Sequence, residues 1–150
     1  MILISGCLAG IKCRYDGGGS YVEKAAGLLS GGGAVPVCPE QLGGCTTPRA
    51  PAEIQGGTGA DVLDGRCRVI NKAGEDVTDS FIKGAEETLR ITVLTGADKA
   101  VLKARSPSCG CGRIYDGSFS GAVREGNGVA AELLTRNGIK VVTEEELELI

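Results

Sequence analysis

The stretch A-V-P-V-C, residues 34–38, is a short apolar run that ends on a cysteine. The chain begins in a similar way, because M-I-L-I-S at residues 1–5 is followed by a glycine and Cys7. Short apolar runs closed by turn-forming residues predict buried strands, so each of these strands is expected to deliver a cysteine at its end. Residues 22–30, between the two runs, are predicted as a helix that stops at consecutive glycines. A strand, a helix and a second strand in this order favour a parallel sheet.

The rest of the chain continues this alternation of strands and helices. Residues 78–95 are predicted as a long core helix, because apolar side chains recur there at every fourth position until Gly96 ends the pattern. The elements expected after it are a strand at residues 100–103, a helix at 129–136, a strand at 139–142 and a final helix opened by a capping box of Thr143 and Glu146. The predicted fold class is therefore α/β, a single domain over residues 1–150 with a mostly parallel, doubly wound (Rossmann-like) sheet.

Two segments interrupt the alternation. Residues 39–59 are rich in proline and glycine and are expected to form a long ordered loop. A turn at Asp64 and Gly65 then opens into an expected strand at residues 66–70, which makes a small β excursion from the main sheet. Residues 110–128 are a glycine-rich stretch that leads to the helix expected at 129–136. Within it, Y-D-G at residues 115–117, like Y-D-G at 15–17, is interpreted as an Asp-Gly turn whose tyrosine packs against the protein.

Seven cysteines and no histidine in 150 residues narrow the possible chemistry. Without an imidazole the chain has no Ser-His-Asp triad, no Cys-His pair and no histidine-ligated zinc, so proton transfer falls to carboxylates, hydroxyls, lysines or thiols. A net charge of -3 and the absence of basic runs disfavour nucleic-acid and membrane partners. The first residues lack the basic segment of a signal peptide and no apolar run reaches transmembrane length, so we expect a cytoplasmic protein with reduced or metal-bound cysteines.

Three of the cysteines are expected to meet in one pocket. Cys7, Cys38 and Cys109 each follow a predicted strand. In open parallel sheets, ligands bind beyond the carboxyl ends of the strands. Three separate segments of the chain are therefore expected to converge on a thiolate-rich site.

The other cysteines are Cys13, Cys45, Cys67 and Cys111. Cys67 is expected to be a small apolar residue of the core, whereas Cys45 and Cys111 are expected in loops on the pocket side, as ligands or as bystanders. Thiolates bind zinc and iron-sulfur clusters, and structural zinc prefers ligands in compact C-x-x-C pairs. Ligands scattered singly along the chain favour a cubane cluster, which can leave one iron without a protein ligand.

Polar residues close to these cysteines are candidates for proton transfer and ligand binding. Glu40 lies two residues after Cys38 and is the first candidate for acid, base or water-positioning work. Ser106 and Ser108 either point their hydroxyls into the pocket or shape a turn. The candidates for binding an anionic part of a ligand are Arg49, Lys103 and Arg105, with a solvated surface charge as the alternative for each.

Several motifs resemble those of the thiouracil desulfidase family over nearly the whole chain. They are I-S-G-C-L at residues 4–8 with C-R-Y-D-G at 13–17, V-P-V-C-P-E-Q-L-G-G at 35–44, and S-P-S-C-G at 106–110 with I-Y-D-G at 114–117. The resemblance implies an oxygen-sensitive [4Fe-4S] cluster held by Cys7, Cys38 and Cys109, with the fourth iron open. It also implies catalytic roles for Glu40 and Ser106.

The same resemblance implies an enzyme, a thiouracil desulfidase, that removes sulfur from a thiolated pyrimidine without net redox change. The expected partner is a small molecule, a thiouracil or thiouridine nucleotide, which water converts to the uracil form and hydrosulfide. The chain departs from the usual family pattern at Cys45 and Cys111. Two alternatives stay open: a non-catalytic iron-sulfur or zinc module that senses sulfide or redox state, and a cluster-free enzyme that passes sulfur through a cysteine persulfide, with Cys111 as the resolving partner of Cys109.

Overall fold

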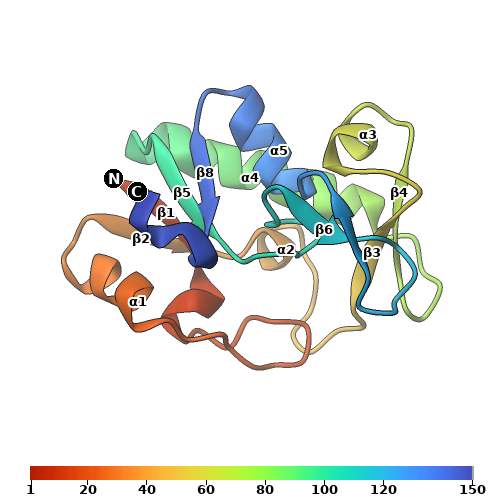
Figure 1. Cartoon of the computed structure of the whole chain (residues 1–150), viewed down its shortest axis with the longest axis horizontal. Coiled ribbons are helices and arrows are strands. Elements are labelled where there is room, and N and C mark those ends of the chain that lie inside the picture. The colour runs from red at the N-terminus through yellow and green to blue at the C-terminus, as the bar shows by residue number, and fades with distance from the viewer. Residues whose placement is uncertain (150) are drawn as a thin grey trace.

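The computed structural model describes residues 1–149 and has an α/β fold (Figure 1). The main sheet has four parallel strands in the spatial order β2-β1-β5-β8. These strands are β1 (Ile2–Ser5), β2 (Ala34–Val37), β5 (Lys99–Leu102) and β8 (Lys140–Thr143). Two small antiparallel pairs lie beside it, β3 (Ala52–Gln55) with β4 (Arg68–Asn71) and β6 (Arg113–Tyr115) with β7 (Val123–Glu125). The predicted fold class, including the β excursion, is confirmed.

The strand order makes a topological switch point between β1 and β5. The chain leaves β1 for β2 on one side and returns to β5 on the other, so the connections diverge from this pair of strands. Such a point leaves a crevice at the carboxyl ends of the two strands, which is where open α/β sheets bind their ligands. The fold therefore leaves a crevice for a ligand beyond Ser5 and Leu102, the last residues of these two strands.

Both faces of the sheet are covered by helices, and neighbouring residues of a strand point to opposite faces. In β1, Leu3 packs in a core cluster with Leu134 of α5 (Val129–Arg136). Ile4 packs on the other face with Ala25 of α1 (Glu23–Ser30). A third cluster lies under the small sheets and includes Phe81 of α4 (Thr78–Thr95). The predicted bounds of α4 and α5 agree with the structure, and Gly96 ends α4 in a left-handed conformation.

The prediction of a long loop at residues 39–59 is wrong in part. This segment contains the one-turn helix α2 (Pro39–Leu42), the strand β3 and the first residue of α3 (Gly59–Leu63). Pro39 occupies the first turn of α2, where its missing N–H costs nothing, so this proline starts a helix instead of a loop. The glycine-rich segment 110–128 likewise contains the β6-β7 hairpin. Its composition gave no indication of these two strands.

The C-terminal helix predicted from the capping box is also corrected. The segment is a 3-10 helix, η2 (Glu144–Leu149), with a kink at Glu146. The hydroxyl of Thr143 accepts the N–H of Glu145, two residues on, at 3.2 Å. An α-helical capping box needs the N–H three residues on, and the shorter contact instead starts a tighter turn.

Helix α2 packs on α4 with the two backbones in direct contact. A Cβ at Gly43, just after α2, would collide with the carbonyl of Ser80, and a Cβ at Gly84 of α4 would collide with the carbonyl of Pro39. Only glycine permits this approach. The contact fixes α2, and with it Glu40, against the longest helix of the fold.

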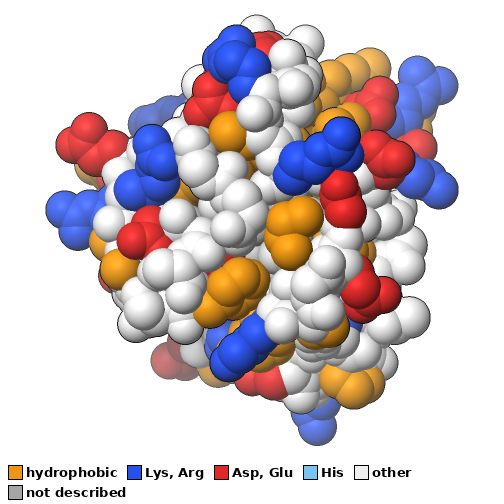
Figure 2. All heavy atoms as spheres, turned by 90° about the vertical axis from the view of Figure 1, so that its right-hand side faces the viewer, with side chains coloured by type: hydrophobic (Ala, Val, Ile, Leu, Met, Phe, Trp, Pro, Cys, Tyr) orange, Lys and Arg blue, Asp and Glu red, His pale blue; other side chains and the backbone are white. Residues whose placement is uncertain are grey.

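The surface around the small sheets mixes charges of both signs. Figure 2 shows this face with Lys and Arg side chains interspersed among Asp and Glu, and with hydrophobic side chains in small separate groups. Among residues 1–149, none of the helices combines the length and the apolar character that crossing a bilayer requires.

Candidate active site

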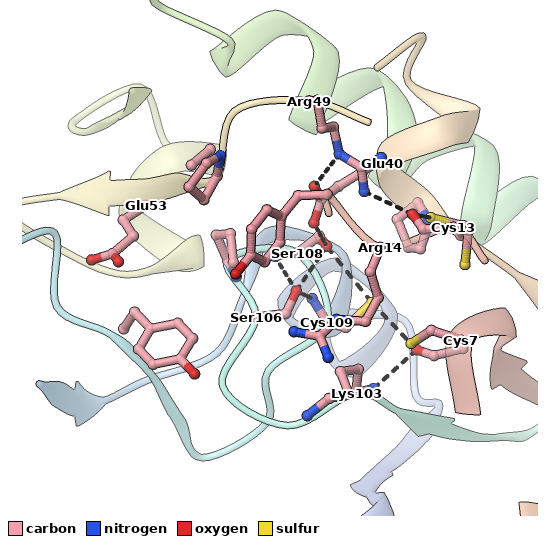
Figure 3. A pocket seen from close by; sticks show the side chains of 18 of the residues that line it. Cys7, Cys13, Arg14, Glu40, Arg49, Glu53, Lys103, Ser106, Ser108 and Cys109 are labelled. Carbon is pink, nitrogen blue, oxygen red and sulfur yellow. Dashed lines mark hydrogen bonds and ion pairs between the residues drawn. The ribbon is translucent and has the colours of Figure 1, made fainter. Parts of the chain in front are cut away.

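A cavity of about 340 Å³ lies beyond the carboxyl ends of β1, β2 and β5. Four cysteines line it: Cys7, Cys13, Cys38 and Cys109. Figure 3 shows three of them, Cys7, Cys13 and Cys109, among the polar side chains of the pocket. The cavity coincides with the switch point of the sheet, as the topology requires.

The three strand-end cysteines come together as the sequence predicts. Cys7 lies in the 3-10 turn η1 (Gly6–Ala9) directly after β1, and Cys38 directly follows β2. Cys109 lies in the loop after β5 and accepts a hydrogen bond from the Ser5 hydroxyl at 3.4 Å. The parallel sheet thus brings residues more than a hundred positions apart to one wall.

Cys13 is a fourth thiol in the pocket. It does not directly follow any of the predicted strands, so the strand-end rule makes no prediction for it. The residue is 2% exposed, and its thiol interacts with those of Cys38 and Cys7. The thiol of Cys38 also points to the Cys13 carbonyl oxygen, at 3.8 Å. The loop after η1 therefore folds back beside the strand ends.

The surroundings favour the protonated form of two of the pocket thiols, those of Cys38 and Cys109. Burial raises the pKa of Cys109 to about 12, although the neighbouring hydroxyls of Ser5 and Ser108 oppose the effect. The hydrogen bond with Cys13, followed by burial, raises the pKa of the Cys38 thiol well above its ordinary value. A thiolate in this pocket needs a cationic partner, which is what a bound metal provides.

The donor set fits an iron-sulfur cluster. Among residues 1–149, no three histidine, cysteine or acidic side chains are arranged to hold a single metal ion. In a [4Fe-4S] cluster each thiolate binds a different iron, so its ligands surround a larger body than one ion. Thiols without any imidazole, spread around one cavity, match that requirement.

The remaining cysteines lie outside the pocket. Cys45 and Cys67 pack at the edge of the core cluster under the small sheets. Cys111 donates a hydrogen bond to the Val141 carbonyl at 3.4 Å and lines a separate cavity. Neither Cys45 nor Cys111 lines the cysteine pocket, so the structure fits the expectation of bystanders better than that of ligands. Cys45 lies directly behind the pocket wall, where its N–H donates to the Glu40 carbonyl at 3.0 Å, whereas the turn after Cys109 leads Cys111 away toward β8.

Glu40 is held from both sides at the pocket wall. Arg49 Nε donates to Glu40 Oε1 at 3.0 Å, and Ser108 Oγ donates to Glu40 Oε2 at 3.0 Å. Figure 3 shows the Arg49 and Ser108 side chains converging on this carboxylate from different segments. The contacts fix the carboxylate plane and leave lone pairs of both oxygens available.

Arg49 makes hydrogen bonds to several groups of the protein itself. Its side chain is 10% exposed, and besides Glu40 it donates to the carbonyls of Thr46 and Cys13 and to the hydroxyl of Thr47, each at 3.0 Å. Most of its N–H donors are thus used within the protein, although the side chain also lines the pocket, so binding of an anionic part of a ligand by Arg49 stays a prediction. The guanidinium ties the loop that carries it to both Glu40 and Cys13.

The other basic candidates are also paired. Lys103 lines the pocket and forms an ion pair with Glu144 at 2.9 Å. Arg105 lines the separate cavity near Cys111 and forms an ion pair with Glu145 at 3.3 Å. Of the two, only Lys103 is placed to meet a ligand in the cysteine pocket.

Ser106 and Ser108 form a directed hydrogen-bond chain that ends on Glu40. Ser106 Oγ accepts the N–H groups of Ser108 and Cys109 at 3.1 and 3.0 Å, so its remaining hydrogen-bonding capacity is its own proton. Ser108 Oγ lies 3.0 Å from Ser106 Oγ and gives its proton to Glu40. Ser108 Oγ also lies 3.7 Å from Cys109 Sγ, but the carboxylate oxygen is the closer and stronger acceptor of its one proton. Ser106 therefore donates to Ser108, and Ser108 donates to Glu40.

Further residues line the pocket without having been predicted there. Among them are Glu53, the basic residues Arg14 and Lys72, and the aromatic residues Tyr15, Tyr115 and Phe119. Tyr15 and Tyr115 each precede an Asp-Gly pair, a pattern that predicts a turn with a packing tyrosine and does not indicate a pocket residue. Glu53 and Phe119 carried no such signal, because their place in the pocket depends on the β3-β4 and β6-β7 pairs that the composition concealed.

The family model of 2-thiouracil desulfurase matches residues 2–146. The uncharacterized protein YbbK of Bacillus subtilis (strain 168) is 50% identical over 147 residues, which cover 98% of this chain and 97% of that protein. A solved structure, the [4Fe-4S]-dependent thiouracil desulfidase TudS, superposes with a TM-score of 0.87 at 41% identity, covering 99% of this chain and 93% of that one.

Proposed function

The chain belongs to the 2-thiouracil desulfurase family, as its motifs indicated, and we propose that it is a [4Fe-4S]-dependent thiouracil desulfidase. The observation that carries the proposal is one cavity in which four thiols and a doubly held carboxylate face each other. Thiols of this kind hold iron-sulfur clusters, and a carboxylate next to the metal can move the protons of a hydrolysis.

Cys7, Cys38 and Cys109 are the proposed cluster ligands, each binding one iron and leaving the fourth iron without a protein ligand. They enter the pocket at or beyond three neighbouring strand ends. When bound, the cluster supplies a Lewis-acidic iron that attracts the thiocarbonyl sulfur and withdraws electrons from the ring carbon. Cys13 lies between Cys7 and Cys38 and is not required as a ligand in this proposal.

Glu40 is the proposed acid and base. Its carboxylate takes a proton from the attacking water and later gives one to the departing sulfur, so that water and the thiocarbonyl compound yield a carbonyl and hydrosulfide. Arg49 holds the carboxylate in place from one side. On the other side Ser106 and Ser108 form the donor chain through which a proton at the Ser106 hydroxyl can pass to Glu40 Oε2.

The proposed substrate is a small thiolated pyrimidine, a free base, nucleoside or nucleotide, and the proposed class of reaction is hydrolysis of a C=S bond. The net charge of -3 and the mixed charges of the face in Figure 2 support a small molecule over a nucleic acid. We place the protein in the cytoplasm, where free thiols and an oxygen-sensitive cluster are kept reduced.

The test is anaerobic purification followed by an absorption spectrum, an iron and sulfide count, and an assay with 2-thiouracil. We expect an iron-sulfur spectrum and one hydrosulfide released for each uracil formed. A protein that retains the cluster but releases no sulfide contradicts the proposal and supports a sensing module. A colourless protein that is active supports transfer through a persulfide instead.

A further inference from the structure

Aromatic side chains are scarce in this chain and concentrated in one place. The sequence has three tyrosines, two phenylalanines and no tryptophan. Three of these five side chains, Tyr15, Tyr115 and Phe119, line the cysteine pocket. The other two are Tyr21, which is exposed, and Phe81, which is part of the core.

Phe119 lies apart from the hydrophobic core of the described residues. It lies in the loop between β6 and β7, and it belongs to none of the three core clusters formed by the described residues. It is nevertheless half-buried, because its side chain faces the pocket. An apolar ring beside a cavity, without a partner from the core, is suited to cover an apolar face of a ligand.

The backbone of Phe119 is held in a conformation that such a residue seldom adopts. Its φ angle is 55°, in the left-handed region that favours glycine. Residues held in this region by their surroundings are concentrated at ligand-binding sites. The conformation of Phe119 therefore needs a specific cause in the surrounding structure.

Glu53 provides that cause. This carboxylate on β3 is 8% exposed, and its Oε1 accepts the N–H groups of Gly117 and Phe119 at 2.9 and 3.1 Å. Gln55, on the same strand, donates to the Gly117 carbonyl at 3.1 Å. A buried carboxylate is costly unless it is hydrogen-bonded, and here its hydrogen bonds fix the loop that presents Phe119.

The other two aromatic residues are less suited to the same task. Tyr15 is 40% exposed, and the Arg14 guanidinium lies over its ring, 5.7 Å from the centroid. The hydroxyl of Tyr115 interacts with Arg105, at the edge of the separate cavity. Phe119 has no polar group, so its contact with a ligand is made by its apolar ring.

We propose that Phe119, positioned by Glu53, is the platform on which the flat ring of the substrate stacks, and that it makes the pocket selective for planar aromatic thiocarbonyl compounds. The inference rests on the proposed function for the identity of the ring. Stacking of a base on an aromatic side chain tolerates different substituents because every base offers a π-face. Loss of ring planarity removes that face while the thiocarbonyl group stays the same.

The experiment compares 2-thiouracil with its 5,6-dihydro derivative, which keeps the thiocarbonyl but not the planar ring. It uses anaerobically purified, cluster-loaded parent protein, Phe119→Leu, Phe119→Trp and the control Tyr21→Leu. Stacking on one aromatic side chain contributes about tenfold or more to affinity, so Phe119→Leu should raise KM for 2-thiouracil by about that factor with little change in kcat. KM for the dihydro compound should stay unchanged, and Phe119→Trp and Tyr21→Leu should keep the selectivity of the parent.

Glu53 is tested in parallel as a positioning residue. Glu53→Gln keeps an acceptor oxygen for the two N–H groups, so it should retain the parent's preference for the planar ring. Glu53→Leu removes the acceptor and should reproduce the KM effect of Phe119→Leu. The iron content and absorption spectrum of each variant show that it has folded around its cluster.

Binding of uracil, measured by calorimetry on the same proteins, separates this inference from the proposed function. Weaker uracil binding by Phe119→Leu supports the platform even if the parent protein releases no sulfide, an outcome that contradicts only the proposed function. A Phe119→Leu protein with the parent's iron content, uracil affinity and ring preference overturns the inference. Absence of uracil binding by the parent protein overturns it as well.

Discussion

Arg49 and Glu40 form an ion pair of 3.0 Å at the wall of the cysteine pocket, with both side chains largely buried. The same guanidinium also holds the carbonyl of Cys13 at 3.0 Å. One side chain therefore ties the carboxylate to the loop that carries a pocket thiol. A buried pair of this kind restricts the geometry of both partners, in contrast to an exposed pair on the surface.

We expect Arg49→Met to lower kcat by about 10- to 100-fold, the usual effect of losing a group that orients a catalytic residue. KM for 2-thiouracil should change little, because Arg49 is committed to Glu40 and to the loop. The matched control is Arg68→Met, which removes an exposed ion pair with Asp76, because neither of these residues lines the pocket. An Arg49→Met protein with the parent's kcat and iron content would show that Glu40 needs no such support.

The cysteine variants test the proposed ligand set. Replacing Cys7, Cys38 or Cys109 by alanine should abolish retention of the cluster, measured as iron and sulfide per chain after anaerobic purification. Cys13→Ala should retain the cluster, because three ligands suffice in the proposed site. Loss of iron in Cys13→Ala would instead indicate a cluster ligated by four cysteines.

The cysteines outside the pocket are the controls for this series. Changes of Cys45, Cys67 or Cys111 should leave the iron content near the parent value, since none of them lines the cavity. If Cys109→Ala keeps a full cluster while Cys111→Ala loses it, the ligand choice is wrong. The separate hydrogen bond of Cys111 to Val141 makes that result unexpected.

The parts of the structure that the sequence predicted are those that depend on local patterns. The four-residue spacing and Gly96 defined α4, and the strand-end rule placed Cys7, Cys38 and Cys109 in one pocket. The bond between Arg49 and Glu40 depends on how a proline-rich loop folds back in space, which no periodicity encodes. The same holds for Glu53 and Phe119, which meet only because two small β pairs lie side by side.

Two glycine-to-alanine substitutions should have opposite effects on stability, because only one of the two glycines lies in the contact between α2 and α4. Gly84→Ala forces a Cβ into the carbonyl of Pro39, and overpacking of this kind destabilises a protein by about 1–3 kcal/mol. Gly27→Ala, on an exposed position of α1 with open space around it, should stabilise it by about 0.5–1 kcal/mol through better helix propensity. Both effects are measured as shifts of the thermal unfolding midpoint, at one scan rate and on anaerobic, cluster-loaded protein. Equal midpoints for the two variants would contradict the tight backbone contact.

The proposed hydrolysis predicts turnover without an electron donor. Exchange of C=S for C=O by water leaves the oxidation states of the ring and the sulfur unchanged, so the cluster-loaded protein should complete many cycles without added reductant or oxidant. Hydrosulfide and uracil are to be counted together over successive cycles under anaerobic conditions. A strict need for an electron donor in every cycle, beyond that used to rebuild the cluster, contradicts the Lewis-acid role.

Glu40→Gln separates catalysis from assembly of the site. The amide keeps the size of the side chain and an oxygen that can accept from Arg49 or Ser108, but it loses the titratable carboxylate. The absorption spectrum and iron content should survive, and turnover should fall by roughly 10²- to 10⁴-fold, the usual contribution of a positioned acid or base. Uracil affinity should change little, which distinguishes a lost proton transfer from a damaged pocket. Near-parent desulfidation by this variant with an intact cluster would move the proton to another group, and Ser106, which begins the hydrogen-bond chain to Glu40, would be the first to replace by alanine.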